Sequence, residues 1–143
     1  MTPILSLWTQ PEPAKKSAPK CLSQRVLVVE DELLLGEIAA ETLTDAGYEV
    51  FTAASAEEAE VMLRDMSVDL LFTDVDLGGQ NGFELAQTAL SLQPLLSIVF
   101  TSGRSRICYG MCRPLKVPFL AKPYRLADLV ETVERALRAT TTQ

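Results

Sequence analysis

Short apolar runs alternate along the chain with longer segments in which apolar residues recur at helical spacing. The runs at residues 25–29, 48–53, 68–73, 95–101 and 117–121 predict five strands. The first of them, rich in valine, is typical of a strand that is buried on both faces. Because a helical segment separates most strands from the next, the chain is predicted to be an α/β protein. We expect a doubly wound, five-stranded parallel sheet with helices on both faces.

The first predicted helix covers residues 33–46 and ends before Gly47, a residue type that commonly terminates helices. Its apolar residues recur at helical spacing, so one face of this helix is expected to be buried against the sheet. The residues predicted to share that face are Leu34, Leu35, Ile38, Ala39, Thr42 and Leu43.

Three further helices are predicted with clear signals. Ser55, with Glu58 three residues later, has the pattern of a helix cap, and the helix that it opens extends to Met66. Another helix covers residues 83 to about 92. The segment 126–137 has the most regular amphipathic pattern in the chain and predicts the last helix.

Two segments depart from this alternation. Residues 102–116 contain Gly110, Pro114 and scattered apolar residues, which predict a short or irregular helix. Residues 1–23 hold four of the eight prolines, three lysines and one acid, and are predicted to form a flexible, locally basic arm. Residues 24–143 are predicted to be one domain. They keep 10 of the 13 basic residues and 18 of the 19 acidic ones, a net charge of −8.

Composition excludes several classes of function. The 143 residues are 48% hydrophobic and carry a formal net charge of −6, so binding to nucleic acid is not expected. The chain has no histidine, which excludes histidine-dependent hydrolysis, His-ligated metals and a phosphohistidine on this chain. No apolar run is long enough to span a bilayer, and no membrane partner is expected. The sparse cysteines, Cys21, Cys108 and Cys112, fit a reducing cytoplasm.

Polar and charged side chains lie at the ends of four predicted strands. Glu30 and Asp31 follow the first strand, Asp74 follows the third, Thr101 ends the fourth and Lys122 follows the fifth. Each alone has an ordinary explanation as a helix cap, a strand end or a solvated charge. Because ligands of open parallel sheets bind at the carboxyl ends of the strands, we expect these side chains to converge at one edge.

This combination of side chains indicates phosphoryl transfer. Carboxylates gathered at one site repel each other, and a hard divalent cation such as Mg²⁺ relieves that repulsion. A carboxylate can accept a phosphoryl group as an acyl phosphate, while a lysine, a metal and a hydroxyl contact its oxygens. The sequence therefore predicts a phosphoryl-transfer site with an aspartate acceptor.

The segments that carry these residues resemble the receiver domain of two-component response regulators. The similar segments are VLVVEDE (26–32), LLFTDVDLGGQNGFEL (70–85), IVFTSG (98–103) and FLAKPY (119–124), in the order and spacing of that family. The resemblance covers about residues 24–139 and implies a flavodoxin-like (βα)5 fold. It also implies a cytoplasmic protein of bacterial phosphorelay signalling, which catalyses only its own aspartyl phosphorylation and dephosphorylation.

The resemblance implies roles for the residues at the strand ends. Asp74 is the implied phosphoacceptor, and Lys122 is the implied phosphate-binding lysine. Asp31 and Asp74 are implied to hold Mg²⁺ directly, together with the backbone carbonyl of Asp76. Glu30 is implied to act on the metal mostly through water.

The resemblance also implies a conformational switch. Thr101 is the implied switch hydroxyl, and Phe119, which lacks the hydroxyl of a tyrosine, is the aromatic residue implied to change rotamer with it. The Lys122–Pro123 peptide bond is expected to be cis. The sequence departs from the family at Glu30, where aspartate is more common, and at Gly78, where many members have proline and the loop is therefore expected to be looser.

Only a few residues follow the last predicted helix, so the chain is expected to be a stand-alone receiver. Its phosphoryl group would come from a partner histidine kinase or phosphotransfer protein, and it would signal by contact with a downstream protein target. Two alternatives remain open. One is a scaffold that uses the receiver fold without phosphorylation. The other is a phosphatase-like enzyme, because Asp74-Val75-Asp76 also resembles the Asp-x-Asp start of haloacid-dehalogenase-type phosphatases.

Overall fold

Five parallel strands form the centre of the molecule in a computed structural model that describes residues 23–103 and 117–141. The strands lie in the order β2-β1-β3-β6-β7, and every neighbouring pair is parallel. Their bounds are Arg25–Val29 (β1), Glu49–Ala53 (β2), Leu70–Asp74 (β3), Ser97–Ser102 (β6) and Phe119–Ala121 (β7). The predicted five-stranded parallel sheet is therefore confirmed, with strand ends that differ from the predicted ones by three residues or fewer.

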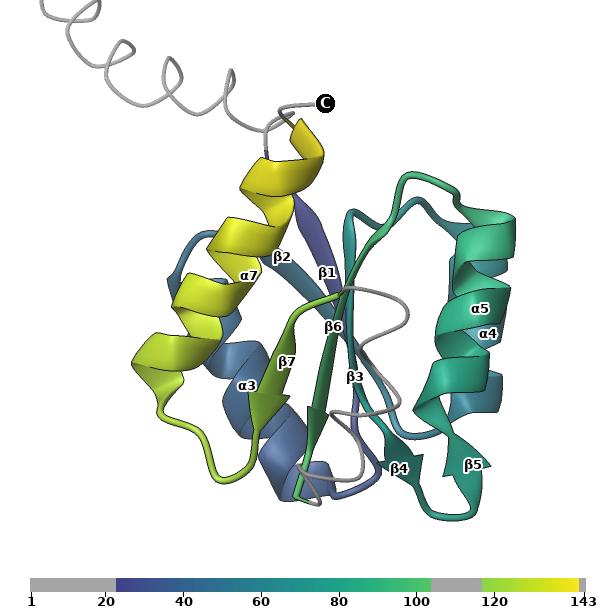
Figure 1. Cartoon of the computed structure of the whole chain (residues 1–143), viewed down its shortest axis with the longest axis horizontal. Helices are drawn as coiled ribbons and strands as arrows, with labels where there is room; N and C mark the ends of the chain where they lie inside the picture. Colours follow the sequence, from purple (N-terminus) through teal and green to yellow (C-terminus); the bar gives the residue numbers. More distant parts are fainter. Residues whose placement is uncertain (1–22, 104–116, 142–143) are drawn as a thin grey trace, which may run out of the picture.

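Helices cover both faces of the sheet. One face carries α3 (Leu33–Asp45) and α7 (Leu126–Thr141), and the other carries α4 (Ala56–Asp65) and α5 (Gly82–Leu92) (Figure 1). As predicted, the Ser55 side chain caps α4 by accepting a hydrogen bond from the backbone N–H of Glu58. No helix within the described ranges is both long and apolar enough to cross a bilayer.

Alternate residues of the central strands pack against the two helical layers. In β1, Leu27 and Val29 belong to the apolar cluster that includes α4 and α5. Val26 and Val28 belong to the cluster that includes α3 and α7. All residues of β3 and β6 are buried. Burial on both faces explains why these strands are continuous apolar runs rather than alternating patterns.

The prediction for the buried face of α3 is partly wrong. The buried residues are Gly36, Ala39 and Leu43, whereas Leu35 and Ile38 are exposed, as is Leu34. The helix lies close to the end of β1 at Gly36. A Cβ added to Gly36 would be only 3.5 Å from the Cβ of Glu30. Since α3 makes this contact through its smallest side chains, the larger apolar side chains are left beside the contact rather than in it.

A small hairpin that the sequence did not predict follows β3. Its strands are β4 (Asp76–Leu77) and β5 (Gln80–Asn81), which pair antiparallel. Gly78 and Gly79 form the turn with φ of 61° and 99°, the left-handed values that a two-residue hairpin turn requires. The Gln80 side chain accepts a hydrogen bond from the backbone N–H of Ala56, 2.9 Å away, and so fixes the hairpin to the start of α4. The expectation of a looser loop at Gly78 stays a prediction.

Two predicted segments lie outside the described residues. They are the arm at 1–23, apart from Ser23, and the short or irregular helix at 102–116, apart from Ser102 and Gly103. The boundary between arm and domain stays a prediction.

Gln93 joins α4, α5 and β3. It is the C-terminal cap residue of α5, and its side-chain amide donates to the carbonyls of Leu63 and Met66 at 2.8 and 2.9 Å. Its side-chain oxygen accepts from the backbone N–H of Val68 at 2.9 Å. One side chain therefore satisfies three backbone groups in the connection between α4 and β3.

Replacing Gln93 by alanine is expected to lower the free energy of unfolding by about 2 kcal/mol, because three backbone groups lose their partners. Gln87 lies on the same helix with an exposed side chain, so Gln87→Ala is the matched control and is expected to change stability by less than about 0.5 kcal/mol. Urea unfolding followed by circular dichroism measures both. Equal stabilities of the two variants would show that the hydrogen bonds of the Gln93 side chain do not stabilise the fold.

Candidate functional site

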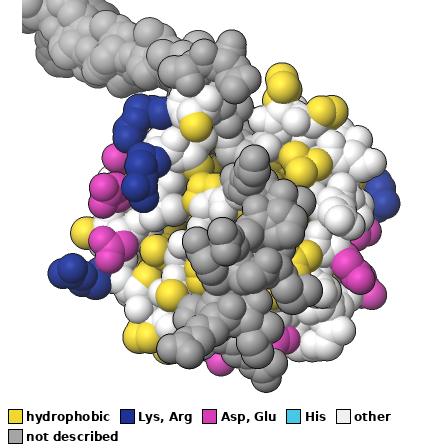
Figure 2. Space-filling view, viewed as in Figure 1, with side chains coloured by type: hydrophobic (Ala, Val, Ile, Leu, Met, Phe, Trp, Pro, Cys, Tyr) yellow, Lys and Arg dark blue, Asp and Glu magenta, His cyan; other side chains and the backbone are white. Residues whose placement is uncertain are grey.

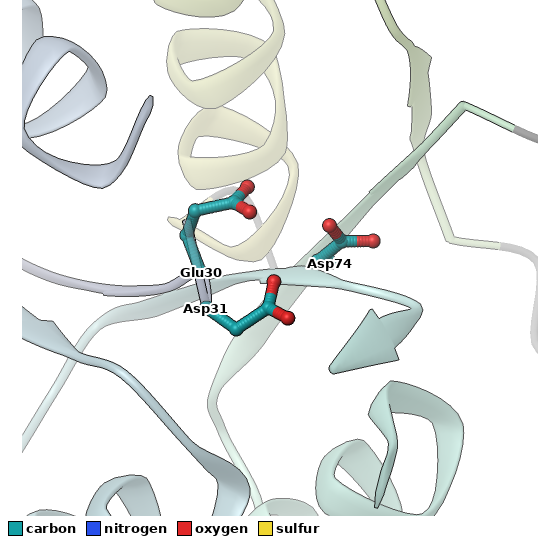
Figure 3. Close-up of side chains that lie close together, drawn as sticks. All are labelled: Glu30, Asp31 and Asp74. Carbon is teal, nitrogen blue, oxygen red and sulfur yellow. The ribbon is translucent and has the colours of Figure 1, made fainter. Parts of the chain in front are cut away.

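Three acidic side chains meet at the carboxyl edge of the sheet. Glu30 and Asp31 directly follow β1, and Asp74 is the last residue of the adjacent strand β3. One carboxylate oxygen from each residue lies within 4.8 Å of the others. Figure 3 shows the three side chains projecting from the two strand ends toward a common space. The predicted convergence of these carboxylates is thus present in the structure.

The two neighbouring acids at the end of β1 have different environments. Glu30 is buried, with an exposed fraction of 6%, whereas Asp31 is exposed. Both oxygens of the Glu30 carboxylate accept hydrogen bonds: Oε1 from Lys122 Nζ at 2.8 Å and Oε2 from the backbone N–H of Glu32 at 3.2 Å. Asp31 is therefore the better placed of the two to bind a ligand from solvent.

Lys122 lies between the two buried carboxylates. Its Nζ donates to Glu30 Oε1 at 2.8 Å and to Asp74 Oδ2 at 2.7 Å. Its backbone N–H donates to the carbonyl of Ser102 at 2.9 Å, which fixes the segment after β7 to β6. The Lys122–Pro123 bond is cis, as expected. The predicted lysine therefore reaches the acidic cluster from the end of the edge strand β7, two strands away from β3.

Burial and charge pairing shift the pKa values of these groups. Burial raises the pKa of Glu30 above its usual 4.5, against the lowering effect of Lys122. For Lys122, burial disfavours the charged form, but the hydrogen bonds to Asp74 and Glu30 outweigh it, and the pKa is raised. The lysine is therefore held as an ammonium ion between two carboxyl groups.

Asp74 is held by its own chain on two sides. Its Oδ1 accepts a hydrogen bond from the backbone N–H of Asp76 at 3.0 Å, while Oδ2 accepts from Lys122. The backbone of Asp74 lies against Gly82, where a Cβ would be only 2.2 Å from the Asp74 carbonyl oxygen. Gly82 also donates its N–H to the carbonyl of Val75 at 2.7 Å. Only glycine fits at this start of α5, so Gly82 allows α5 to begin directly against the end of β3 that carries Asp74.

Thr101 lies beside Asp74 on the adjacent strand β6. The two residues are register partners, and the carbonyl of Thr101 accepts a hydrogen bond from Val75. The Thr101 side chain is 1% exposed, and its Oγ1 has no hydrogen-bond partner among the described residues. A buried hydroxyl without a partner is unusual and calls for an explanation.

The other two predicted site residues lie at the margin of the cluster. Phe119, on β7, is half-buried, pairs in register with Phe100 and packs against the apolar cluster of α4 and α5. It lies one strand beyond Thr101. Asp76 has an exposed side chain, and its backbone N–H contacts Asp74. The role predicted for its carbonyl stays a prediction.

Two glycines of the site were not predicted from the sequence. Gly82 contacts Asp74, and a Cβ on Gly78 would lie 3.0 Å from Asp31 Oδ2. Glycines next to a functional aspartate are a weak signal in one sequence, because turns and helix ends use the same residue type. Their importance becomes visible only when the backbones of separate segments are placed side by side.

The donor set fits a hard divalent cation. Glu30, Asp31 and Asp74 offer oxygen ligands, the type that Mg²⁺ prefers, and Asp31 is open to solvent. Two of the three carboxylates already share the ammonium of Lys122, so the cluster still has an excess of negative charge. A cation bound beside Asp31 would relieve that excess.

Comparison with known proteins identifies a family for this arrangement. The sequence model described as "response regulator receiver domain" matches residues 26–134. Over 118 residues the chain is 30% identical to the response regulator receiver protein CpdR of Brucella abortus (strain 2308), an alignment that covers 81% of this chain and 98% of CpdR.

A second relative and a solved structure agree with this family. The chain is 31% identical over 119 residues to part of the sensor kinase CckA of Brucella abortus (strain 2308), covering 80% of this chain and 13% of CckA. The crystal structure of a response regulator receiver protein from Sinorhizobium medicae WSM419 is similar, with a TM-score of 0.76 and 28% identity. It covers 82% of this chain and 97% of that one. Other curated relatives are longer, and the chain spans 47% of one and 24% of another.

Replacing Lys122 by methionine is expected to lower the free energy of unfolding by about 3 kcal/mol at neutral pH, because two buried carboxylates lose their cation. Arg125→Met is the matched control: the Arg125 side chain is 86% exposed, so its loss is expected to change stability by less than about 0.5 kcal/mol. Denaturant unfolding measures both variants.

The destabilisation by Lys122→Met is expected to grow with pH. Burial holds the pKa of Glu30 above 4.5, and loss of the lysine that lowers it raises this pKa further. A carboxyl with a raised pKa in the folded state stabilises the fold fully below its unfolded pKa and loses this contribution as pH rises through the folded pKa. The stability gap between wild type and variant therefore widens as pH rises from about 4.5 toward neutrality. A difference in stability between wild type and variant that stays constant over this pH range would show that Lys122 does not lower the pKa of Glu30.

Proposed function

Because the chain belongs to the response regulator receiver domain family, we propose that it accepts a phosphoryl group on Asp74 in a two-component phosphorelay. The donor is the phosphohistidine of a partner histidine kinase or phosphotransfer protein. The single observation that carries this proposal is the position of Asp74, whose buried carboxylate touches Lys122 and lies within 4.8 Å of Asp31 and Glu30.

In the proposed reaction an oxygen of Asp74 bonds to phosphorus while the bond from phosphorus to the donor nitrogen breaks. The donor imidazole leaves with the electron pair of that bond and takes up a proton, and Asp74 becomes an acyl phosphate. Lys122 is within reach of the new phosphoryl oxygens because its Nζ already contacts Asp74 at 2.7 Å. Its ammonium offsets the charge that the phosphoryl group brings.

We assign the metal site to the acids at the same edge. Asp31, Asp74 and the backbone carbonyl of Asp76 would hold Mg²⁺, and Glu30 would contribute mostly through water. Bound there, Mg²⁺ neutralises negative charge on the phosphoryl oxygens. The division between Asp31 and Glu30 agrees with their contacts, because both oxygens of Glu30 are already hydrogen-bonded and Asp31 is exposed.

Thr101 and Phe119 are proposed to report phosphorylation to the surface. The Thr101 hydroxyl is buried without a partner among the described residues, and Thr101 is the register partner of Asp74 on the adjacent strand, so a phosphoryl oxygen on Asp74 can accept its hydrogen bond. Phe119 lies on the next strand and is half-buried. We propose that the Phe119 ring changes rotamer when Thr101 shifts toward the phosphoryl group.

The proposed output is contact with a downstream protein in the cytoplasm. Residues 24–143 carry a net charge of −8, which disfavours binding to the nucleic-acid backbone. These 143 residues contain no histidine, so the phosphohistidine that donates the group does not lie among them. The only chemistry proposed for the chain is the formation and loss of its own acyl phosphate.

Incubation with acetyl phosphate and Mg²⁺ is expected to add one phosphoryl group to the wild-type chain and none to Asp74→Asn, as measured by intact-protein mass spectrometry. The matched control is Asp76→Asn, which changes an exposed side chain two residues away and is expected to keep the adduct. Chelation of Mg²⁺ is expected to suppress the reaction. An equal adduct on Asp74→Asn, or none on wild type, would refute the phosphoacceptor assignment.

The isosteric variant Thr101→Val is expected to keep or slightly raise the free energy of unfolding, because it removes a buried hydroxyl that has no partner within residues 23–103 and 117–141. Thr73→Val is the control. Thr73 is also buried, but its hydroxyl donates to the Asp74 carbonyl at 2.9 Å, so its loss is expected to cost about 1 kcal/mol.

Thr101→Val is also expected to accept the phosphoryl group but to lose the chemical-shift changes that phosphorylation causes around Phe119 in the NMR spectrum. Shift changes of wild-type size in this variant would argue against a switch through Thr101.

A further inference from the structure

The β4–β5 hairpin lies at the carboxyl edge of the sheet, directly after the strand that carries Asp74 (Figure 1). Asp76, the first residue of the hairpin, donates its backbone N–H to Asp74 Oδ1 at 3.0 Å. In the turn, a Cβ added to Gly78 would lie 3.0 Å from Asp31 Oδ2. The hairpin therefore borders two of the three carboxylates of the site.

Three contacts hold the hairpin against the rest of the domain. Leu77 is buried and belongs to the apolar cluster that includes α4 and α5. The Gln80 side chain accepts a hydrogen bond from the backbone N–H of Ala56 at 2.9 Å. The Asn81 side chain accepts one from the backbone N–H of Phe83 at 2.7 Å and so caps α5. Because both strands of the hairpin make such contacts, the contacts determine where its turn lies.

Asp31 differs from the other two carboxylates of the cluster in how it is held. The side chains of Glu30 and Asp74 each accept two hydrogen bonds. The Asp31 carboxylate accepts no hydrogen bond and forms no ion pair within the described ranges, and the residue is exposed. Its orientation therefore depends on the atoms that border it, and Gly78 lies beside its Oδ2.

We propose that Gly78 is a positioning residue for the metal ligand Asp31, an inference that rests on the proposed magnesium site. Ordinary contacts of a Cβ begin at 3.4 Å, so a side chain at position 78 would displace Asp31 Oδ2. The fold can accommodate that displacement, because the Asp31 carboxylate is the exposed end of a side chain. The metal site cannot, because Mg²⁺ binds its oxygen ligands at about 2.1 Å in a nearly ideal octahedron.

The surroundings of Asp31 are open to a cation from solvent. Asp31 and Asp76 are both exposed. Acidic side chains reach the surface at the lower end of the view in Figure 2, the end at which the carboxyl edge of the sheet lies in Figure 1. A cation that approaches this edge therefore meets negative charge. The turn beside Asp31 consists of Gly78 and Gly79 and adds no side chain that would cover the carboxylate.

Gly79 provides a matched comparison within the same turn. Its φ of 99° is farther than the 61° of Gly78 from the value of about 57° that left-handed residues prefer. A Cβ on Gly79 would meet nothing within 4 Å. Alanine is therefore strained at both positions, and more so at Gly79, but only at Gly78 does it contact Asp31. The pair separates the strain of the turn from the contact with the metal ligand.

Titration of the unphosphorylated chain with Mg²⁺, followed in amide NMR spectra, measures the affinity and shows whether each variant is folded. Gly78→Ala is expected to bind Mg²⁺ about tenfold more weakly than wild type, as when other residues that orient metal ligands are changed. Gly79→Ala is expected to keep the wild-type affinity, although its urea midpoint falls at least as far as that of Gly78→Ala. Asp31→Asn is expected to bind at least as weakly as Gly78→Ala, because the charged ligand itself is lost.

A second pair of variants covers the case in which alanine unfolds the chain. Gly78→Asn and Gly79→Asn add the same Cβ, and asparagine tolerates the left-handed conformation better than alanine does. The same difference in Mg²⁺ affinity between the two positions is expected.

Three results overturn the role of Gly78. Wild-type or tighter Mg²⁺ binding by Gly78→Ala would show that position 78 does not orient Asp31. An equal loss in Gly78→Ala and Gly79→Ala would assign the effect to the conformation of the turn. Wild-type affinity in Asp31→Asn would show that Asp31 is not a ligand.

The titration also separates this proposal from the proposed function. No phosphoryl donor is present, so the role of Gly78 can fail while Asp74 still accepts a phosphoryl group in the mass-spectrometric test. Absence of Mg²⁺ binding by the wild-type chain would instead overturn the metal site and the role of Gly78 together.

Discussion

The site depends on two buried carboxylates that share one ammonium ion. Glu30 and Asp74 are each 6% exposed, and both accept a hydrogen bond from Lys122. Burying a charge is costly unless it is paired, so this arrangement exists only if the strands bring the three residues together with little error. β1 and β3 are neighbours and supply the acids directly, whereas the lysine comes from beyond β7, two strands away from β3, and needs its long side chain to reach them.

The topology explains why the cluster forms at this edge. From β1 the chain first adds β2 on one side and then β3, β6 and β7 on the other. The direction of winding therefore changes between β1 and β3, which is where open α/β sheets bind ligands. Glu30, Asp31 and Asp74 follow these two strands, so their convergence follows from strand order alone.

Strand order and motif spacing made most of the site predictable from the sequence. The features that were predicted wrongly or missed are the buried face of α3 and the hairpin after β3. Buried strands read as apolar runs, so residues at their ends could be located to within three positions or fewer. The prediction of the buried face of α3 was partly wrong. Leu35 and Ile38 have the helical spacing of buried residues, but Gly36 makes the close contact with the end of β1. The hairpin after β3 was missed because two-residue strands leave no periodic pattern, and only the φ values of Gly78 and Gly79 reveal its turn.

Two features of the site are unfavourable for the folded chain alone. The cluster of Glu30, Asp31 and Asp74 has more negative charge than Lys122 offsets, and Thr101 has a buried hydroxyl without a partner in the part of the chain that the structure describes. A cation would offset the first, and an oxygen acceptor would satisfy the second. Asp74 and Thr101 are register partners, so both requirements arise at one place. A phosphoryl group bound with Mg²⁺ brings the acceptor and the cation together, which is why we favour an aspartyl-phosphate site over a scaffold that never uses these residues.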